Sequence, residues 1–141
     1  MPIAYRFNKA INLLHTTLSG EVTQKEVVEF YDEIEAIDRG LVGLRELIDF
    51  VPMTSAAMPA AKIDGLIALI DGIYSRNDVL PRVACLAPNA PGADIAARFV
   101  AAMQNREPQI AAVHVSDLDA ALGFLGIPEA SWPLVTRNKA P

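Results

Sequence analysis

Residues 81–87 have the sequence Pro-Arg-Val-Ala-Cys-Leu-Ala, and every position after Arg82 is apolar. A strand that is apolar on both faces fits the centre of a parallel sheet, because helices cover such a sheet from both sides. Two similar runs, residues 44–50 (Leu-Arg-Glu-Leu-Ile-Asp-Phe) and residues 110–115, precede and follow it in the chain. Pro52 prevents the earlier run from continuing as a central strand, since proline lacks the N–H that a neighbouring strand needs. The sequence therefore predicts three strands of a mainly parallel sheet.

The segments between these strands have the periodicity of helices. Apolar residues recur at helical spacing from Pro59 to about Arg76, and again within residues 94–104. Residues 54–59 (Thr-Ser-Ala-Ala-Met-Pro) are predicted to form a loop that enters the first of these helices. Strands that alternate with helices along a chain indicate a parallel sheet with helices on its faces.

The N-terminal residues predict a β-hairpin with strands over residues 3–7 and 10–18. A helix is expected to follow, because Thr23 and Glu26 have the spacing of a capping box, in which each side chain satisfies a free backbone N–H. Gly40 is suited to end that helix.

The predicted fold is α/β: a five-stranded mixed sheet started by the β-hairpin, in the order β-β-α-β-α-β-α-β-α, with about four helices. The last helix is expected to begin at Ser116, as its N-cap, and to end at Gly126. Residues 1–127 are predicted to form a single domain. Residues 128–141 contain three prolines and no clear period, and are predicted to form a C-terminal tail.

Composition narrows the functional classes. The chain has 141 residues, 52% of them hydrophobic, and a formal net charge of −5. The acidic balance disfavours nucleic acid as a partner. One cysteine and two histidines give no basis for an internal disulfide or a histidine-rich metal site, and neither a metal nor a cofactor is predicted. No signal peptide or membrane span is found, since a span needs about 20 apolar residues, and a cytoplasmic protein is expected.

The order of elements and several short motifs resemble the SpoIIAA-like proteins. The motifs are a strand ending Leu-Ile-Asp-Phe, a Pro-Arg-Val-Ala strand and a closing Asp-Leu-Asp-Ala-Ala-Leu helix, within a resemblance that covers residues 3–126. That group is related to the STAS domains of anti-sigma-factor antagonists and is likened to lipid-binding Sec14 domains. Phosphorylatable STAS antagonists carry an Asp-Ser-Ser-Gly-like motif at the start of the helix after the third strand. The matching stretch here, Pro-Met-Thr-Ser-Ala-Ala, has hydroxyls at Thr54 and Ser55 but lacks the Asp and the Gly.

A polar edge is one candidate functional region. In open parallel sheets, ligands bind beyond the carboxyl ends of the strands. That edge is expected to bring together Asp49, Thr54, Ser55 and Asn89. A purely structural interpretation stays open, in which the hydroxyl residues cap helices and Asn89 makes a turn.

An apolar pocket is the other candidate region, bordered by Met58, Ile63 and Phe99. These residues favour a non-catalytic binding or regulatory module, expected to be a homodimer, that recognises a small apolar or amphipathic ligand or a protein partner. The alternative is a STAS-type phospho-switch that acts through Ser55 or Thr54.

An enzyme is the third hypothesis. Cys85 and His114 lie on strands that could neighbour each other, which is the arrangement of a nucleophile and its base. A cysteine inside an apolar strand is usually an inert hydrophobe, however. The chain also lacks a Gly-rich phosphate loop and a nucleophile-elbow motif. No catalytic constellation is supported by the sequence.

Overall fold

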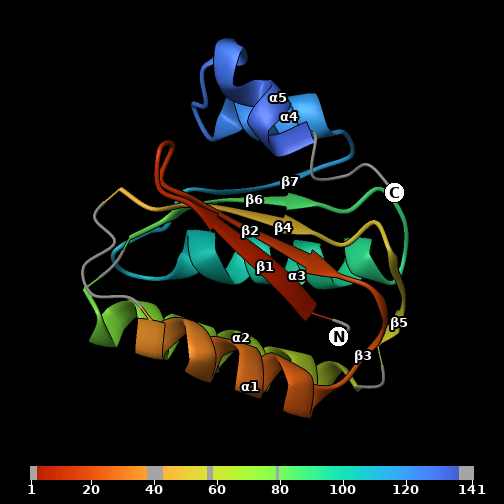
Figure 1. Ribbon diagram of the computed structural model, residues 1–141. Coiled ribbons are helices and arrows are strands. Elements are labelled where there is room, and N and C mark those ends of the chain that lie inside the picture. The colour runs from red at the N-terminus through yellow and green to blue at the C-terminus, as the bar shows by residue number, and fades with distance from the viewer. Residues whose placement is uncertain (1–2, 38–42, 57–58, 79, 137–141) are drawn as a thin grey trace.

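The computed structural model describes residues 3–37, 43–56, 59–78 and 80–136. A five-stranded sheet lies at the centre of the molecule, between two layers of helices (Figure 1). Its spatial order is β1-β2-β4-β6-β7, in which β1 and β2 are antiparallel and the later neighbours are parallel. The strands are β1 (Ile3–Asn8), β2 (Leu13–Leu18), β4 (Arg45–Asp49), β6 (Arg82–Leu86) and β7 (Ala112–Val115). The predicted mixed sheet and its initial hairpin are confirmed.

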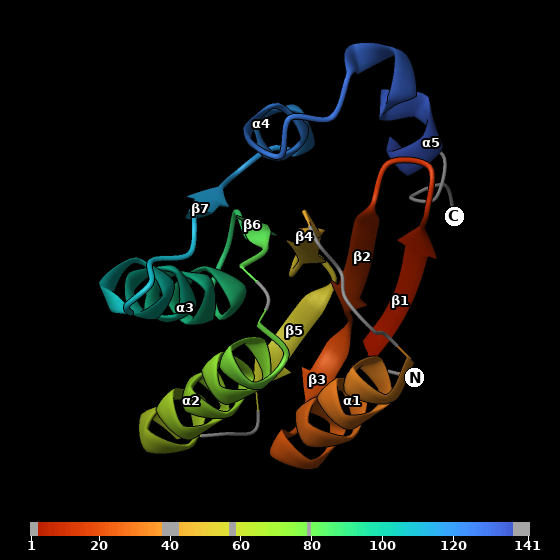
Figure 2. The same ribbon diagram turned by 90° about the vertical axis from the view of Figure 1, so that its left-hand side faces the viewer.

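The longer helices cover one face of this sheet and the shorter helices cover the other (Figure 2). The first layer consists of α1 (Gln24–Ile37), α2 (Ala60–Arg76) and α3 (Gly92–Asn105). The second consists of α4 (Leu118–Phe124), a single 3-10 turn (Glu129–Ser131) and α5 (Trp132–Thr136). The described ranges contain five α-helices where the sequence predicts about four, because the described part of the tail adds α5.

Each layer has its own core, because alternate side chains of a strand point to opposite faces. On β4, Ile48 packs in the core beneath α1, α2 and α3, whereas Leu47 packs in the core beneath α4 and α5. Val135 of α5 is 2% exposed within that second core, and the Trp132 indole N–H donates to the Ile127 carbonyl at 2.8 Å. The tail up to residue 136 thus packs on the sheet.

Two short strands form a second sheet that the sequence does not predict. They are β3 (Gly20–Val22) and β5 (Met53–Ala56), which pair in parallel beside the point where α1 begins (Figure 1). Gly20 has φ +64°, a conformation that favours glycine, and this bend directs the chain out of β2 into β3. The expectation of a loop over these residues is wrong, because Thr54 and Ser55 lie in β5.

The helix starts agree in part with the predictions. The capping box of α1 is confirmed, since the Thr23 backbone N–H donates to the Glu26 carboxylate at 2.9 Å and the Glu26 N–H donates to the Thr23 hydroxyl at 3.4 Å. Ser116 is not the N-cap of α4, because Asp117 accepts from the Ala120 N–H at 2.8 Å. The predicted stop at Gly40 lies outside the described residues.

Candidate functional site

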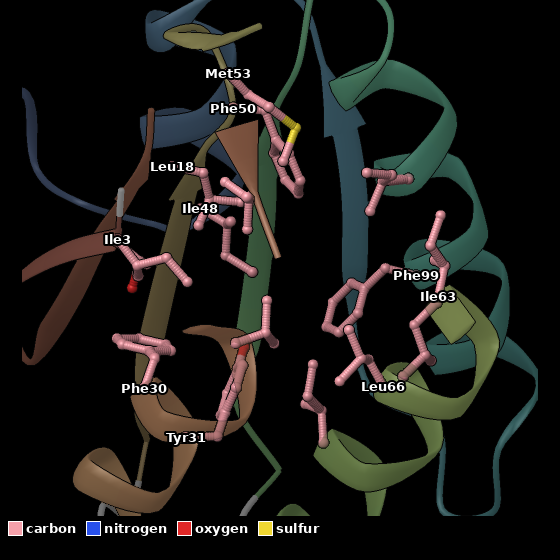
Figure 3. Close-up of a pocket in the computed structure, with 16 residues that line it drawn as sticks. Ile3, Leu18, Phe30, Tyr31, Ile48, Phe50, Met53, Ile63, Leu66 and Phe99 are labelled. Carbon is pink, nitrogen blue, oxygen red and sulfur yellow. The ribbon is translucent and has the colours of Figure 1, made fainter. Parts of the chain in front are cut away.

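An apolar cavity of about 80 Å³ lies between the sheet and the layer of α1, α2 and α3. Phe30 and Tyr31 of α1 lie on one side of it, and Ile63, Leu66 and Phe99 face them from the other side (Figure 3). The lining residues are Ile3, Thr16, Leu18, Val22, Val27, Phe30, Tyr31, Ile48, Phe50, Met53, Ile63, Leu66, Ile67, Ile70, Ile95 and Phe99. The wall is hydrocarbon except for the hydroxyls of Thr16 and Tyr31 and the sulfur of Met53.

The rim of the cavity is formed by the first turns of three helices. Among its described lining residues, Val27, Ile63 and Ile95 are half-buried, whereas the others are buried. Each of the three is the fourth residue of its helix, on α1, α2 and α3 respectively. The cavity therefore reaches the surface where these three helices begin.

Two of the residues predicted for an apolar pocket, Ile63 and Phe99, line this same cavity. Met58, the third, lies outside the described residues. Met53 also lines the cavity, from β5.

The residues predicted for the polar edge do not line this cavity. Asp49 is 2% exposed, lies on the same face of β4 as Leu47, and accepts the Val51 N–H at 2.9 Å. Asn89 is exposed, and its backbone carbonyl accepts the Ala93 N–H at the start of α3. Both residues thus have structural contacts at turns, and their part in binding stays a prediction.

Thr54 and Ser55 are placed differently from the expectation. The helix that follows them begins at Ala60, with Pro59 as its N-cap and no side-chain cap. A phosphoryl group on Thr54 or Ser55 would therefore not lie at the start of a helix, which is where the resemblance to the STAS antagonists places the matching motif. Thr54 is exposed and Ser55 is half-buried, opposite Glu21 in the register of β3 and β5.

A buried polar group next to the cavity was missed at the sequence level. Glu46 of β4 is 4% exposed, and the Tyr74 hydroxyl lies 2.9 and 3.0 Å from its two carboxylate oxygens. Tyr74 belongs to the same apolar core as Tyr31, which lines the cavity. Strand alternation places Glu46 on the same face as Ile48 and Phe50, and this signal could have identified it as a buried acid.

Burial controls the ionisation of this group. Desolvation raises the pKa of the Glu46 carboxyl to about 7, although the hydrogen bond from Tyr74 opposes that rise. Desolvation also raises the pKa of the Tyr31 and Tyr74 hydroxyls well above their ordinary value, and the charge of Glu46 adds to the rise. Glu46 is therefore the member of this group that titrates near neutral pH.

The Cys85–His114 pair does not have the properties of a nucleophile and its base. The two residues are register partners on β6 and β7. Cys85 is 0% exposed, and desolvation followed by the nearby Glu46 carboxylate raises the pKa of its thiol far above the ordinary value. The His114 Nε2 lies 2.6 Å from the Ala87 carbonyl oxygen. The thiol is thus protonated at neutral pH, whereas nucleophilic attack needs the thiolate.

Within the described ranges, no three His, Cys, Asp or Glu side chains form a group that could hold a metal ion. No helix in that part of the chain is both long and apolar enough to cross a bilayer.

The chain has a SpoIIAA-like fold. One solved structure with this fold is the anti-sigma factor antagonist SpoIIAA in its unphosphorylated form, at 14% identity and a TM-score of 0.51. The match covers 89% of this chain and 99% of that one. Another is an uncharacterized protein of the DUF3478 family from Shewanella loihica PV-4, at 16% identity and a TM-score of 0.54, covering 87% of this chain and 91% of that one.

At these identities the similarity defines the fold and not the activity. No protein-family model matches the chain, and no curated protein matches its sequence.

Proposed function

We propose that this protein is a non-catalytic binding module whose cavity takes up a small apolar or amphipathic molecule. The observation that supports the proposal is the apolar cavity beneath α1, α2 and α3. An empty cavity destabilises a fold by about 24 cal/mol per Å³, which is about 2 kcal/mol for this one. A ligand that fills the cavity would recover that free energy.

The cavity volume limits what enters it. An engineered cavity of about 150 Å³ holds one benzene molecule. At about 80 Å³, this cavity has room for about three or four non-hydrogen atoms. The ligand is therefore a small molecule, or a larger one that inserts a short apolar end past Val27, Ile63 and Ile95.

The test is mass spectrometry of the protein purified gently from cells, under native and denaturing conditions. We expect a small molecule that is bound in the native spectrum and released on denaturation. Leu66→Phe should abolish its retention, because the larger ring fills the cavity. Leu69→Phe is the matched control, since Leu69 lies on the same helix, is 36% exposed and does not line the cavity.

Two results would contradict the proposal. One is a bare polypeptide in both spectra, together with no response of the cavity methyl groups to dissolved isobutane. The other is equal retention of the small molecule by the two variants. The native spectrum also tests the predicted homodimer.

A phospho-switch is the second candidate function, and the exposure of Thr54 favours it. A structurally similar protein is an anti-sigma factor antagonist described in an unphosphorylated form. Phosphorylation of Thr54 or Ser55 would add charge to β5 and change the surface offered to a protein partner. The same spectra would show it as a covalent increase of one phosphoryl mass that Thr54→Ala or Ser55→Ala removes, and its absence under all growth conditions would reject this candidate.

A further inference from the structure

β1 is the outermost strand of the five-stranded sheet, and β2 is its neighbour on one side (Figure 2). Among the described residues, no strand pairs with its other side. The six residues Ile3–Asn8 pair with β2 in one unbroken register, without a bulge or a proline. Prolines and bulges are common ways in which proteins block an exposed strand edge. The outer edge of β1 can therefore accept another strand.

The register shows which backbone groups lie at this edge. The Asn12 carbonyl accepts the Arg45 N–H, and backbone groups point alternately to the two sides of a strand. The even-numbered residues of β2 therefore bond to β4, and the odd-numbered ones bond to β1. On β1 the partners of those odd-numbered residues are even-numbered, such as Arg6. The backbone N–H and C=O groups of Tyr5 and Phe7 consequently point outward.

A groove of about 350 Å³ lies beside this edge, between β1 and α1. Three carboxylates from successive turns of α1 line it, those of Glu26, Glu29 and Glu33. The Tyr5 hydroxyl donates to Glu33 at 2.9 Å, and the Tyr5 ring packs edge-on against Phe30 with ring centroids 5.6 Å apart. The groove thus combines aromatic rings with acidic side chains.

The charge of the groove distinguishes between possible occupants. Within the described ranges, the one cation paired with these carboxylates is Lys25, whose Nζ lies 3.7 Å from Glu29 in an exposed and hence weak ion pair. A symmetric antiparallel pairing of two β1 strands would place both α1 helices on the same face of the joined sheet. Their three carboxylates would then approach three like charges, which opposes a second copy and favours a basic occupant.

We propose that β1 binds an extended segment of a partner protein, which adds a strand to the sheet and carries lysine or arginine at alternate positions. The outward backbone groups of Tyr5 and Phe7 supply the hydrogen bonds. Alternate residues of a strand are about 7 Å apart, and Glu29 and Glu33 are about 6 Å apart along α1, so each of two cations meets a carboxylate. The proposal does not depend on a ligand in the cavity.

The probe is an acetylated and amidated peptide, Thr-Lys-Val-Lys-Val-Lys-Thr, titrated into the isotope-labelled full chain at about 0.15 M salt and followed by NMR. We expect saturable shifts of the β1 amide signals and slower hydrogen exchange of the Tyr5 and Phe7 amides. A matched peptide with glutamate at the three lysine positions should not bind.

N-methylated peptides separate strand addition from charge attraction alone. In an added strand, one alternate set of peptide N–H groups faces β1 and the other set faces solvent. Methylation of the first set should abolish binding, whereas methylation of the second set should leave it unchanged.

Variants of α1 test the acidic groove. Glu29→Lys and Glu33→Lys should each weaken binding of the lysine peptide by about fivefold. Asp32→Lys is the matched control with a change of less than twofold, because Asp32 is exposed on the same helix, makes the same change in charge and does not line the groove.

Several results would overturn the proposal. They are failure of the lysine peptide to bind, equal effects of the two methylated peptides, and equal effects of the groove variants and the control. Slow exchange of the Tyr5 and Phe7 amides in the free protein would also overturn it, since the edge would then be covered already. A dependence of that protection on protein concentration would identify the cover as a second copy.

Discussion

At the scale of single residues, Glu46 is the most unusual side chain described. A carboxylate buried among apolar residues is costly unless it has partners, and its partner here is a neutral tyrosine rather than a cation. The raised pKa of about 7 is the consequence, since protonation removes the buried charge. This side chain therefore links the stability of the fold to pH.

The sign of that link can be predicted. Between about pH 4.5 and pH 7 the folded protein keeps a proton on Glu46 that the unfolded chain has lost, so the free energy of unfolding falls as pH rises. The total loss is about 3 kcal/mol. Glu46→Gln should remove this loss, and should exceed the wild type in stability by about that amount at pH 8 and by little at pH 4.5.

Urea unfolding of both proteins across this pH range measures the difference. Glu21→Gln, at an exposed position on β3, is the control and should retain the wild-type pH dependence. Parallel pH profiles for wild type and Glu46→Gln would show that Glu46 has the same pKa in the folded and the unfolded protein, which would contradict the prediction.

At the scale of elements, local signals account for the well-predicted helices and strands. The capping box at Thr23 and Glu26 starts α1 where the sequence indicates, because both partners lie within four residues. The pairing of β3 with β5 had no such signal. These strands have three and four residues, too few to show a period, and their paired residues are 33 or 34 positions apart in the chain.

Thr23→Ala should destabilise the fold by about 1 kcal/mol, because it leaves a helix N–H without its acceptor. Chemical unfolding monitored by circular dichroism measures this loss. Thr54→Ala, at an exposed position of β5, is the matched control and should change stability by less than about 0.5 kcal/mol. Equal effects of the two substitutions would contradict a capping role for Thr23.

At the scale of the whole molecule, we interpret the two layers of helices as having different functions. The layer of α1, α2 and α3 encloses the cavity, whereas α4 and α5 cover the other face of the sheet (Figure 2). The division into a domain of residues 1–127 and a tail remains a prediction. The burial of Val135 indicates that the tail adds to the stability of the domain.

Val135→Ala should lower the free energy of unfolding by about 2 kcal/mol, because it removes buried hydrocarbon from the second core. Leu134→Ala is the matched control at the neighbouring position, since Leu134 is 40% exposed. Thermal unfolding of both variants measures the difference. A negligible effect of Val135→Ala would show that the tail is an energetically independent appendage.

The sequence predicted part of the candidate site. Ile63 and Phe99 were identified because helical periodicity places them on the buried faces of their helices. That they line one cavity depends on how α2 and α3 pack, which no local pattern records. Glu46 was overlooked in favour of Asp49, although Asp49 serves the turn at Val51.

The sequence by itself determined the α/β class, the order of the main elements and the start of α1. These features follow from periodicity, turn residues and caps, which act over a few neighbouring residues. The tertiary structure alone decided the β3–β5 pairing, the cavity and the contact of the Tyr74 hydroxyl with the buried Glu46 carboxylate. Each of these joins side chains from distant parts of the sequence, and their contacts arise only when the helices pack on the sheet.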